Sequence, residues 1–219
     1  MVDDPDAPGP ARNRPAIADS RVATGKGDDG TTGLLYGGPR ISKDDDRTDA
    51  YGTVDEAVAA LGVARAEADP TEELGSLLLR LQRELFVVGA ELASNPGAWD
   101  RLQDGSTRVS EAMVTGLEDL LGDLERRIAM PTEFVVPGET RLSAAIELAR
   151  TITRRAERRA VGLRRTGLLA GEWLVPYLNR LADLLWVLAR AAEQAEDRVA
   201  TPARSAPRPV RRRTGAPLS

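Results

Sequence analysis

The sequence contains no cysteine and no histidine among its 219 residues. Without cysteine, the chain has no disulfide, no thiol nucleophile and no thiolate metal site. Without histidine, it lacks the commonest zinc ligand and the usual general base at neutral pH, so a Ser-His triad is excluded. Any catalysis must therefore use carboxylates, lysine, arginine, hydroxyl groups, the backbone or a bound cofactor, and no protein metal ligand is predicted.

Long hydrophobic runs are also absent. No apolar stretch approaches the roughly 18 residues of a membrane span, and the amino end lacks the charged-then-apolar pattern of a signal peptide. We therefore expect a cytoplasmic protein with no membrane partner. The net charge of −4 would repel nucleic acid, so no nucleic-acid partner is expected, and an anionic ligand would need a local cluster of cations.

Both ends of the chain are rich in proline and lack apolar periodicity. Residues 1–20 and 201–219 are therefore predicted to be disordered. The second tail is rich in arginine, which could contact polyanions, although a solvated tail is the more usual case. Residues 21–200 are predicted to form one domain, because the hydrophobic content of 42% is enough to fill a core.

The apolar residues between the tails recur mainly with helical spacing. Five helices are predicted, over residues 44–68, 69–95, 107–128, 140–165 and 172–198. No stretch alternates convincingly with a period of two, and aromatic residues make up only 4% of the chain. The sequence therefore predicts an all-α, up-and-down five-helix bundle without a sheet.

The segment "TGKGDDGTTG", residues 24–33, contains four glycines. It matches G-x-G-x-x-G formally, but no strand precedes it and no helix opens at its third glycine, so a dinucleotide-binding fold is not predicted. The P-loop pattern also fails, since no lysine follows Gly30. Glycines nevertheless allow successive backbone N–H groups to converge on one anion. A flexible surface linker is the competing interpretation.

Side chains near this segment suit a phosphate. Thr31 and Thr32 add hydroxyl donors, and Lys43 could supply a cation. Asp28 and Asp29 would repel phosphate unless magnesium or a basic partner intervened.

The segment "ARTITRRAERRAV", residues 149–161, concentrates arginine in an acidic protein. Arg150 and Arg154 lie four residues apart, so two like charges stack on one helix face together with Glu157. Such a row favours an anion, and a triphosphate would match its charge. A solvated basic face is the alternative. Asn179 is a weaker candidate for contact with a nucleotide base or ribose.

Five motifs, taken in order and spacing, resemble one known family. They are "TGKGDDGTTGLLYGG", "ISKDDDRTDAYGTVDE", "FVVPG", "ARTITRRAERRAV" and "YLNRLADLLWVLAR". Together they resemble the ATP:cob(I)alamin adenosyltransferases of the propanediol-utilisation type over residues 24–190. The resemblance implies a five-helix bundle that assembles as a homotrimer with active sites between subunits. It also implies ATP, Mg²⁺ and a corrinoid as ligands, and delivery of the product to an adenosylcobalamin-dependent enzyme.

The resemblance assigns roles to individual residues. The glycine-rich segment would wrap the triphosphate through Thr24, Gly27, Asp28, Gly30, Thr31 and Thr32. Lys43 and Arg154 would act on the phosphates, and Glu157 and Asn179 would be further nucleotide contacts. Arg155 and Arg158 are added to the nucleotide contacts because they belong to the same concentration of arginines. Asp55 and Arg150 match a salt bridge that crosses the subunit interface and orders the site. Phe134 matches an aromatic residue that packs near the lower face of the corrin and keeps the lower ligand away from cobalt.

Two positions depart from the family pattern. Gly25 stands where the family usually has lysine or arginine, so that phosphate contact is absent or comes from Lys26. Glu139 stands where a second glycine commonly follows "PG", which changes the local turn near Phe134.

The implied reaction transfers the 5′-deoxyadenosyl group of ATP to the cobalt of cob(I)alamin, giving adenosylcobalamin and triphosphate. The strong nucleophile is the reduced cobalt itself, which explains how a chain without histidine or cysteine could catalyse it. Two alternatives remain at this point. A nucleotide kinase or hydrolase would form ADP or AMP without a corrinoid, and a non-catalytic scaffold or corrinoid carrier would bind without releasing triphosphate.

Overall fold

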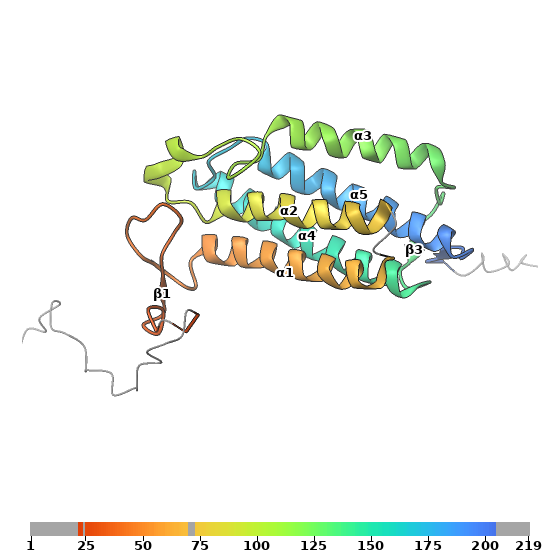
Figure 1. Cartoon of the computed structure of the whole chain (residues 1–219), viewed down its shortest axis with the longest axis horizontal. Coiled ribbons are helices and arrows are strands. Elements are labelled where there is room, and N and C mark those ends of the chain that lie inside the picture. Colours follow the sequence, from red (N-terminus) through yellow and green to blue (C-terminus); the bar gives the residue numbers. More distant parts are fainter. Residues whose placement is uncertain (1–21, 24, 70–72, 205–219) are drawn as a thin grey trace, which may run out of the picture.

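The computed structural model describes residues 22–23, 25–69 and 73–204, and within them the chain is mostly helical (Figure 1). Its α-helices are α1 Asp46–Glu67, α2 Glu73–Leu92, α3 Glu111–Arg127, α4 Arg141–Arg165 and α5 Leu174–Ala195. A 3₁₀ helix, η1, spans Pro96–Arg101. Successive α-helices run in opposite directions along the bundle, so the predicted helical, up-and-down architecture is confirmed for these residues. The predicted triphosphate contact Thr24 lies outside the described residues.

Helix starts are set by capping residues. Asp45 accepts a hydrogen bond from the backbone N–H of Arg47 at 2.9 Å, so α1 begins two residues later than predicted. Thr140 and Ser143 form a reciprocal capping box that begins α4. The helices that were expected from residues 107 and 172 begin at Glu111 and Leu174.

Two short pairs of strands correct the expectation that no sheet would form. β1 Thr31–Thr32 pairs antiparallel with β2 Ile41–Ser42. β3 Val135–Val136 pairs antiparallel with β4 Thr201–Pro202, a segment that was expected to be part of the disordered tail. Strands of two residues are too short to produce an alternating pattern, because their pairing depends on a partner far away in the chain.

The buried side chains are small where α1 meets α4 and large on α5. α1 and α4 pack against each other through small buried residues, and α4 also packs against α5. The small residues are Ala50, Ala57, Ala60 and Ala64 of α1 and Ala145, Ala149, Ala156 and Ala160 of α4. Leucines fill the other side, namely Leu178, Leu181, Leu184, Leu185 and Leu188 of α5. Because small side chains allow close approach of helix axes, α4 is held firmly between α1 and α5.

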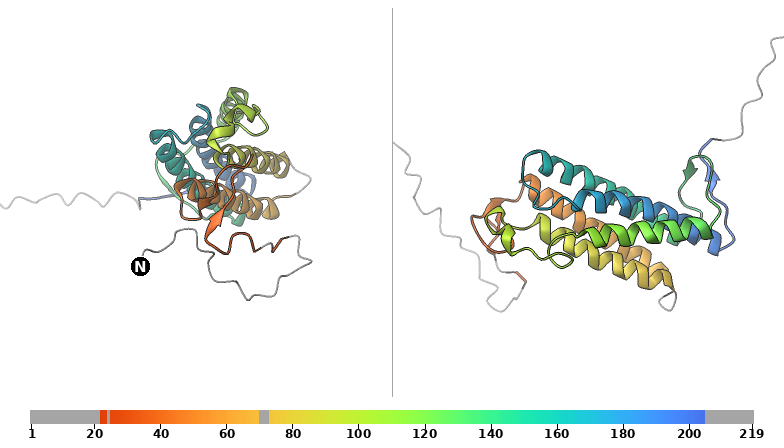
Figure 2. Two further views of the ribbon diagram at one scale, coloured as in Figure 1. Left: turned by 90° about the vertical axis from the view of Figure 1, so that its left-hand side faces the viewer. Right: turned by 90° about the horizontal axis from the view of Figure 1, so that it is seen from above.

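The two strand pairs lie at opposite ends of the bundle (Figures 1 and 2). The β1–β2 pair precedes α1 and lies at the same end as η1, whereas β3 and β4 lie at the end where α5 finishes. None of the described helices has the length and apolar character needed to cross a membrane.

Candidate active site

We call residues 25–43 the strap, because this segment wraps the end of the bundle before α1 begins (Figure 2). Arg40 holds the glycine-rich turn in shape. Its guanidinium donates to Thr31 Oγ1 at 2.7 Å and to the backbone carbonyls of Lys26 and Thr31, both at 2.8 Å. The Thr31 hydroxyl in turn donates to Asp29 at 2.8 Å. The turn therefore has a defined conformation, set by one arginine that no sequence motif marks as part of the site.

Lys43 reaches back over the same turn. Its backbone N–H donates to the Gly30 carbonyl at 2.8 Å, and its ammonium nitrogen would lie 2.9 Å from a Cβ at position 27. A side chain at Gly27 would therefore displace the end of the Lys43 side chain, and its Cβ would lie 3.3 Å from the Thr31 carbonyl oxygen. Lys43 also lines a surface hollow of about 460 Å³. The other lining residues are Asp44, Thr48, Asp49, Gly52, Thr53 and Glu56.

The strap is fixed to the body of the bundle at Leu35. Its N–H donates to the Ala93 carbonyl at 2.8 Å, and its carbonyl accepts from Asn95 at 3.1 Å. The next residue, Tyr36, has a left-handed φ of 66°, and the guanidinium of Arg101 lies 4.4 Å from its ring centroid. A non-glycine residue in this conformation costs free energy, so the surrounding contacts must stabilise it. The anchor keeps the strap at the start of α1.

A second hollow, of about 430 Å³, lies on the surface shared by α4 and α5. It is lined by Arg154, Glu157, Arg158, Val161, Arg165 and Asn179. Asn179 donates to Glu157 Oε1 at 3.3 Å, and its amide oxygen accepts from Arg180 at 2.8 Å. The structure therefore brings together four residues that the sequence analysis assigned to nucleotide binding: Arg154, Glu157, Arg158 and Asn179.

Arg155 does not belong to that group. It pairs with Glu56 of α1, and Arg159 one turn later pairs with Asp49 of the same helix. Each residue of a helix is rotated by about 100° from the one before, so Arg154 and Arg155 face different neighbours. Among the described residues, the Lys43 hollow and the Arg154 hollow share no lining residue. Within one chain, the two halves of the expected site lie on different sides of α4.

Asp55 and Arg150 are likewise apart within the chain. Asp55 is exposed on α1 and lines an apolar hollow of about 420 Å³ with Tyr51 and Phe86. Arg150 donates instead to Glu147 on its own helix, at 2.6 Å.

Phe134 is 88% exposed, directly before β3. Its carbonyl accepts a hydrogen bond from the Ala203 N–H at 2.7 Å, so the segment after α5 supports it. Gly138 has a φ of 123°, but Glu139 does not have a positive φ, and its carboxylate lies 3.9 Å from Arg198. The departure at Glu139 therefore introduces no backbone strain. Gly25, the other departure, has a φ of 67°, which favours glycine.

Two carboxyl groups near the helix ends have pKa values that differ from their ordinary ones: Asp45 at the start of α1 and Glu91 near the end of α2. The hydrogen bond from the Arg47 side chain lowers the pKa of Asp45 to about 2, so this carboxylate stays ionised at the start of α1. Burial raises the pKa of Glu91, although its carboxylate accepts hydrogen bonds from the N–H groups of Val109 and Gly171. No group of three or more acidic, histidine or cysteine residues in the described ranges could hold a metal ion.

The fold and the two hollows define a class: a helical bundle with an arginine-rich hollow between α4 and α5 that suits an anionic ligand, and a second hollow where Lys43 lies among acidic residues. A family model for cobalamin adenosyltransferases matches residues 22–192. The chain is 43% identical over 177 residues to a corrinoid adenosyltransferase of Citrobacter freundii, covering 81% of this chain and 97% of the relative. It is 36% identical over 193 residues to a corrinoid adenosyltransferase of Mycobacterium leprae, covering 83% and 96%.

Solved structures of corrinoid adenosyltransferases also resemble this chain. A variant PduO-type ATP:corrinoid adenosyltransferase from Lactobacillus reuteri, complexed with cobalamin and ATP, matches with a TM-score of 0.75 and 29% identity. The match covers 84% of this chain and 100% of that one. The chain therefore belongs to the cobalamin adenosyltransferase family, and the resemblance drawn from its motifs is confirmed.

Proposed function

We propose that the chain transfers the 5′-deoxyadenosyl group of ATP to the cobalt of cob(I)alamin or a related corrinoid, releasing triphosphate. Family membership supports this activity, and so does the relative solved with both ATP and cobalamin. In the reaction, the reduced cobalt supplies the electron pair for the new cobalt–carbon bond. The bond between C5′ and the phosphate oxygen breaks, and triphosphate leaves with the electrons of that bond.

We further propose that each active site is built from two subunits of a homotrimer. The observation that supports this most directly is the separation of the two hollows within one chain. Lys43 and Arg154 line separate hollows in one chain, and the packing of α4 between α1 and α5 opposes a rotation of α4 that would bring Arg154 toward the strap. A cyclic assembly would place the strap of one subunit against the α4–α5 surface of the next.

The chain's residues have distinct tasks in such a site. The ammonium group of Lys43 neutralises one part of the triphosphate, and Arg154 stabilises the charge that develops on it as the bond breaks. Glu157 and Asn179, which are hydrogen-bonded to each other, orient the nucleoside so that C5′ faces the cobalt. Mg²⁺, carried by the phosphates, would add further charge stabilisation when bound.

Phe134 serves the corrinoid. Its ring is exposed and its backbone is held by the segment after α5, so the ring could cover the lower face of the corrin and exclude water and a lower axial ligand. We expect Phe134→Ala to lower kcat by about tenfold while leaving the KM for ATP unchanged. The electronic spectrum of bound cob(II)alamin should lose its four-coordinate signature, and an intact signature would remove Phe134 from this role.

An anaerobic assay of the full chain tests the activity. With ATP, Mg²⁺ and chemically reduced cob(I)alamin, the cob(I) absorbance should fall and triphosphate should appear in equal amount. Formation of ADP or AMP without corrinoid would instead indicate a kinase or hydrolase. Binding of both ligands without triphosphate release would indicate a carrier.

A further inference from the structure

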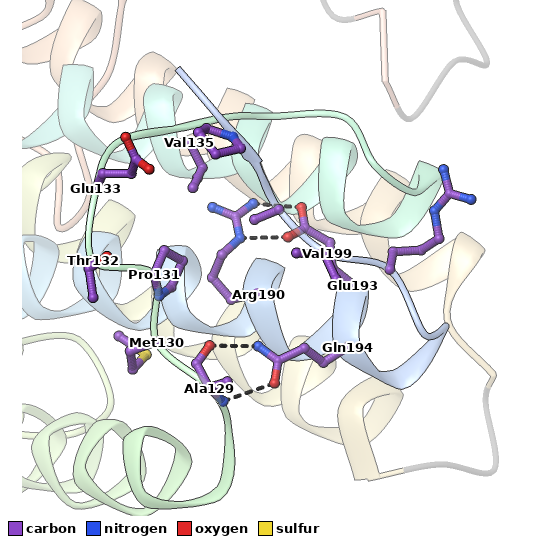
Figure 3. A pocket seen from close by; sticks show the side chains of 13 residues that line it. Ala129, Met130, Pro131, Thr132, Glu133, Val135, Arg190, Glu193, Gln194 and Val199 are labelled. Carbon is purple, nitrogen blue, oxygen red and sulfur yellow. Dashed lines mark hydrogen bonds and ion pairs between the residues drawn. The ribbon is translucent and has the colours of Figure 1, made fainter. Parts of the chain in front are cut away.

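Four side chains of alternating charge form a continuous network between α4 and α5. Arg190 donates two hydrogen bonds to Glu193, each 2.7 Å long, as Figure 3 shows. It also donates to Glu147 Oε1 at 3.2 Å. The second oxygen of Glu147 accepts from Arg150 Nε at 2.6 Å. The order of charges is therefore Glu193, Arg190, Glu147, Arg150.

The network is almost completely removed from water except at one end. The side chains of Arg190 and Glu193 are each 1% exposed and that of Glu147 is 4% exposed, whereas Arg150 is 22% exposed. Buried charges are stable only when they are paired. One buried arginine cannot neutralise two buried glutamates, so Arg150 supplies the missing positive charge and is held beside Glu147.

The end of this network formed by Arg190 and Glu193 borders a pocket. Arg190 and Glu193 border a cavity of about 340 Å³, whose lining also includes Pro131, Val135 and Val199 (Figure 3). Gln194 closes one side through two hydrogen bonds to the backbone of Ala129, of 2.8 and 2.9 Å. The Arg190 guanidinium also lies 5.5 Å from the Trp186 ring centroid, so it is fixed by the ring on one side and by both glutamates on the other.

The geometry at Arg150 leaves one side of its guanidinium group available. Glu147 occupies the Nε position, and the described residues provide no further polar partner for the two terminal nitrogens. These nitrogens form the edge that binds a carboxylate with two parallel hydrogen bonds.

We propose that Glu147, Arg190 and Glu193 are positioning residues, which hold Arg150 so that its terminal edge can bind a carboxylate of the neighbouring subunit. This proposal rests on the proposed function, in which that carboxylate is Asp55. The three residues do not touch either substrate. They act through Arg150, by restricting its rotamers and by fixing which edge it presents.

A double-mutant cycle tests the proposal. Glu147→Gln should lower kcat/KM by about tenfold in the otherwise unchanged chain, but by less than about twofold when Arg150 is already alanine. A merely structural glutamate would cause equal losses in both backgrounds, and this result would overturn the proposal. Asp123→Asn is the matched control, because it removes an exposed carboxylate with the same three-residue spacing to Arg126. We expect no change from it.

The same cycle has a second readout that does not need activity. The subunit dissociation constant, measured by sedimentation, should rise for Glu147→Gln only when Arg150 is present. If the full chain forms trimers but is inactive, the proposed function fails while this cycle still decides the role of Glu147. A chain that remains monomeric has no neighbouring carboxylate, and the proposal is then wrong. If Glu147→Gln does not fold, Glu193→Gln replaces it in the cycle.

Discussion

The strap and the α4–α5 surface both present cations, but they are built in different ways. In the strap, the shape of the backbone depends on a few hydrogen bonds, three of them from Arg40. On α4, Arg154 stands at a fixed position of a long helix whose opposite face is buried. A change in the strap should therefore alter its shape and hence ligand affinity, whereas a change on α4 should remove a charge and leave the structure unchanged.

Arg154→Ala should have the largest effect. Removing this guanidinium group takes away stabilisation of the departing triphosphate, so we expect kcat/KM to fall by about a thousandfold. The helical circular dichroism signal should not change, because the side chain is exposed. Arg126→Ala, an exposed arginine of α3, is the control and should retain full activity. Near-normal turnover of the Arg154 variant would exclude Arg154 from the site.

Reversing the charge at Asp55 comes next. Asp55→Arg would place two cations opposite each other at the proposed interface, and we expect activity to fall by about a hundredfold. Adding Arg150→Asp should recover about tenfold of this loss. Recovery would be partial, because Glu147 then loses one of its two ionic partners and keeps only Arg190. If Asp55→Arg has the same activity with and without Arg150→Asp, Asp55 and Arg150 do not form a direct ion pair.

Arg40→Ala tests the strap itself. The three hydrogen bonds that define the turn would be lost, so we expect the KM for ATP to rise by about tenfold with less than a twofold change in kcat. Arg40→Lys retains the charge but not the fork of donors. If the shape of the strap is what matters, steady-state kinetics should show the same defect in both variants. Normal kinetics of the lysine variant would show that charge alone is sufficient.

The smallest effect is expected at Asp45, where the strap meets α1. Asp45→Ala removes the helix cap, which should lower the free energy of unfolding by about 1 kcal/mol near neutral pH. The pKa of Asp45 is about 2 in the folded chain, below its ordinary value of 3.8. Its stabilising contribution is therefore complete above pH 3.8 and is lost as the pH falls toward 2. Denaturant unfolding should show that the difference in the free energy of unfolding between variant and parent narrows over that range. A constant difference would contradict the lowered pKa of Asp45.

The sequence predicted the helices well because helical periodicity is local. It failed where contacts join distant residues, as in the pairing of Val135–Val136 with Thr201–Pro202. The same reason explains why Arg40 and Arg190 were not selected, since their partners are recognised only once the chain has folded. Arg155 was grouped with Arg154 from the concentration of arginines, but its position on the helix directs it to Glu56 of α1.

Mixing two inactive variants tests the shared site most directly. Lys43→Ala damages only the strap half, and Arg154→Ala damages only the α4–α5 half. If each site combines the strap of one subunit with α4 of the next, random trimers from equal amounts will contain intact sites at about a quarter of their interfaces. We predict that dissociating and reassembling the two variants together restores about a quarter of the parental rate of cob(I) consumption. No activity in verified mixed trimers would contradict the account.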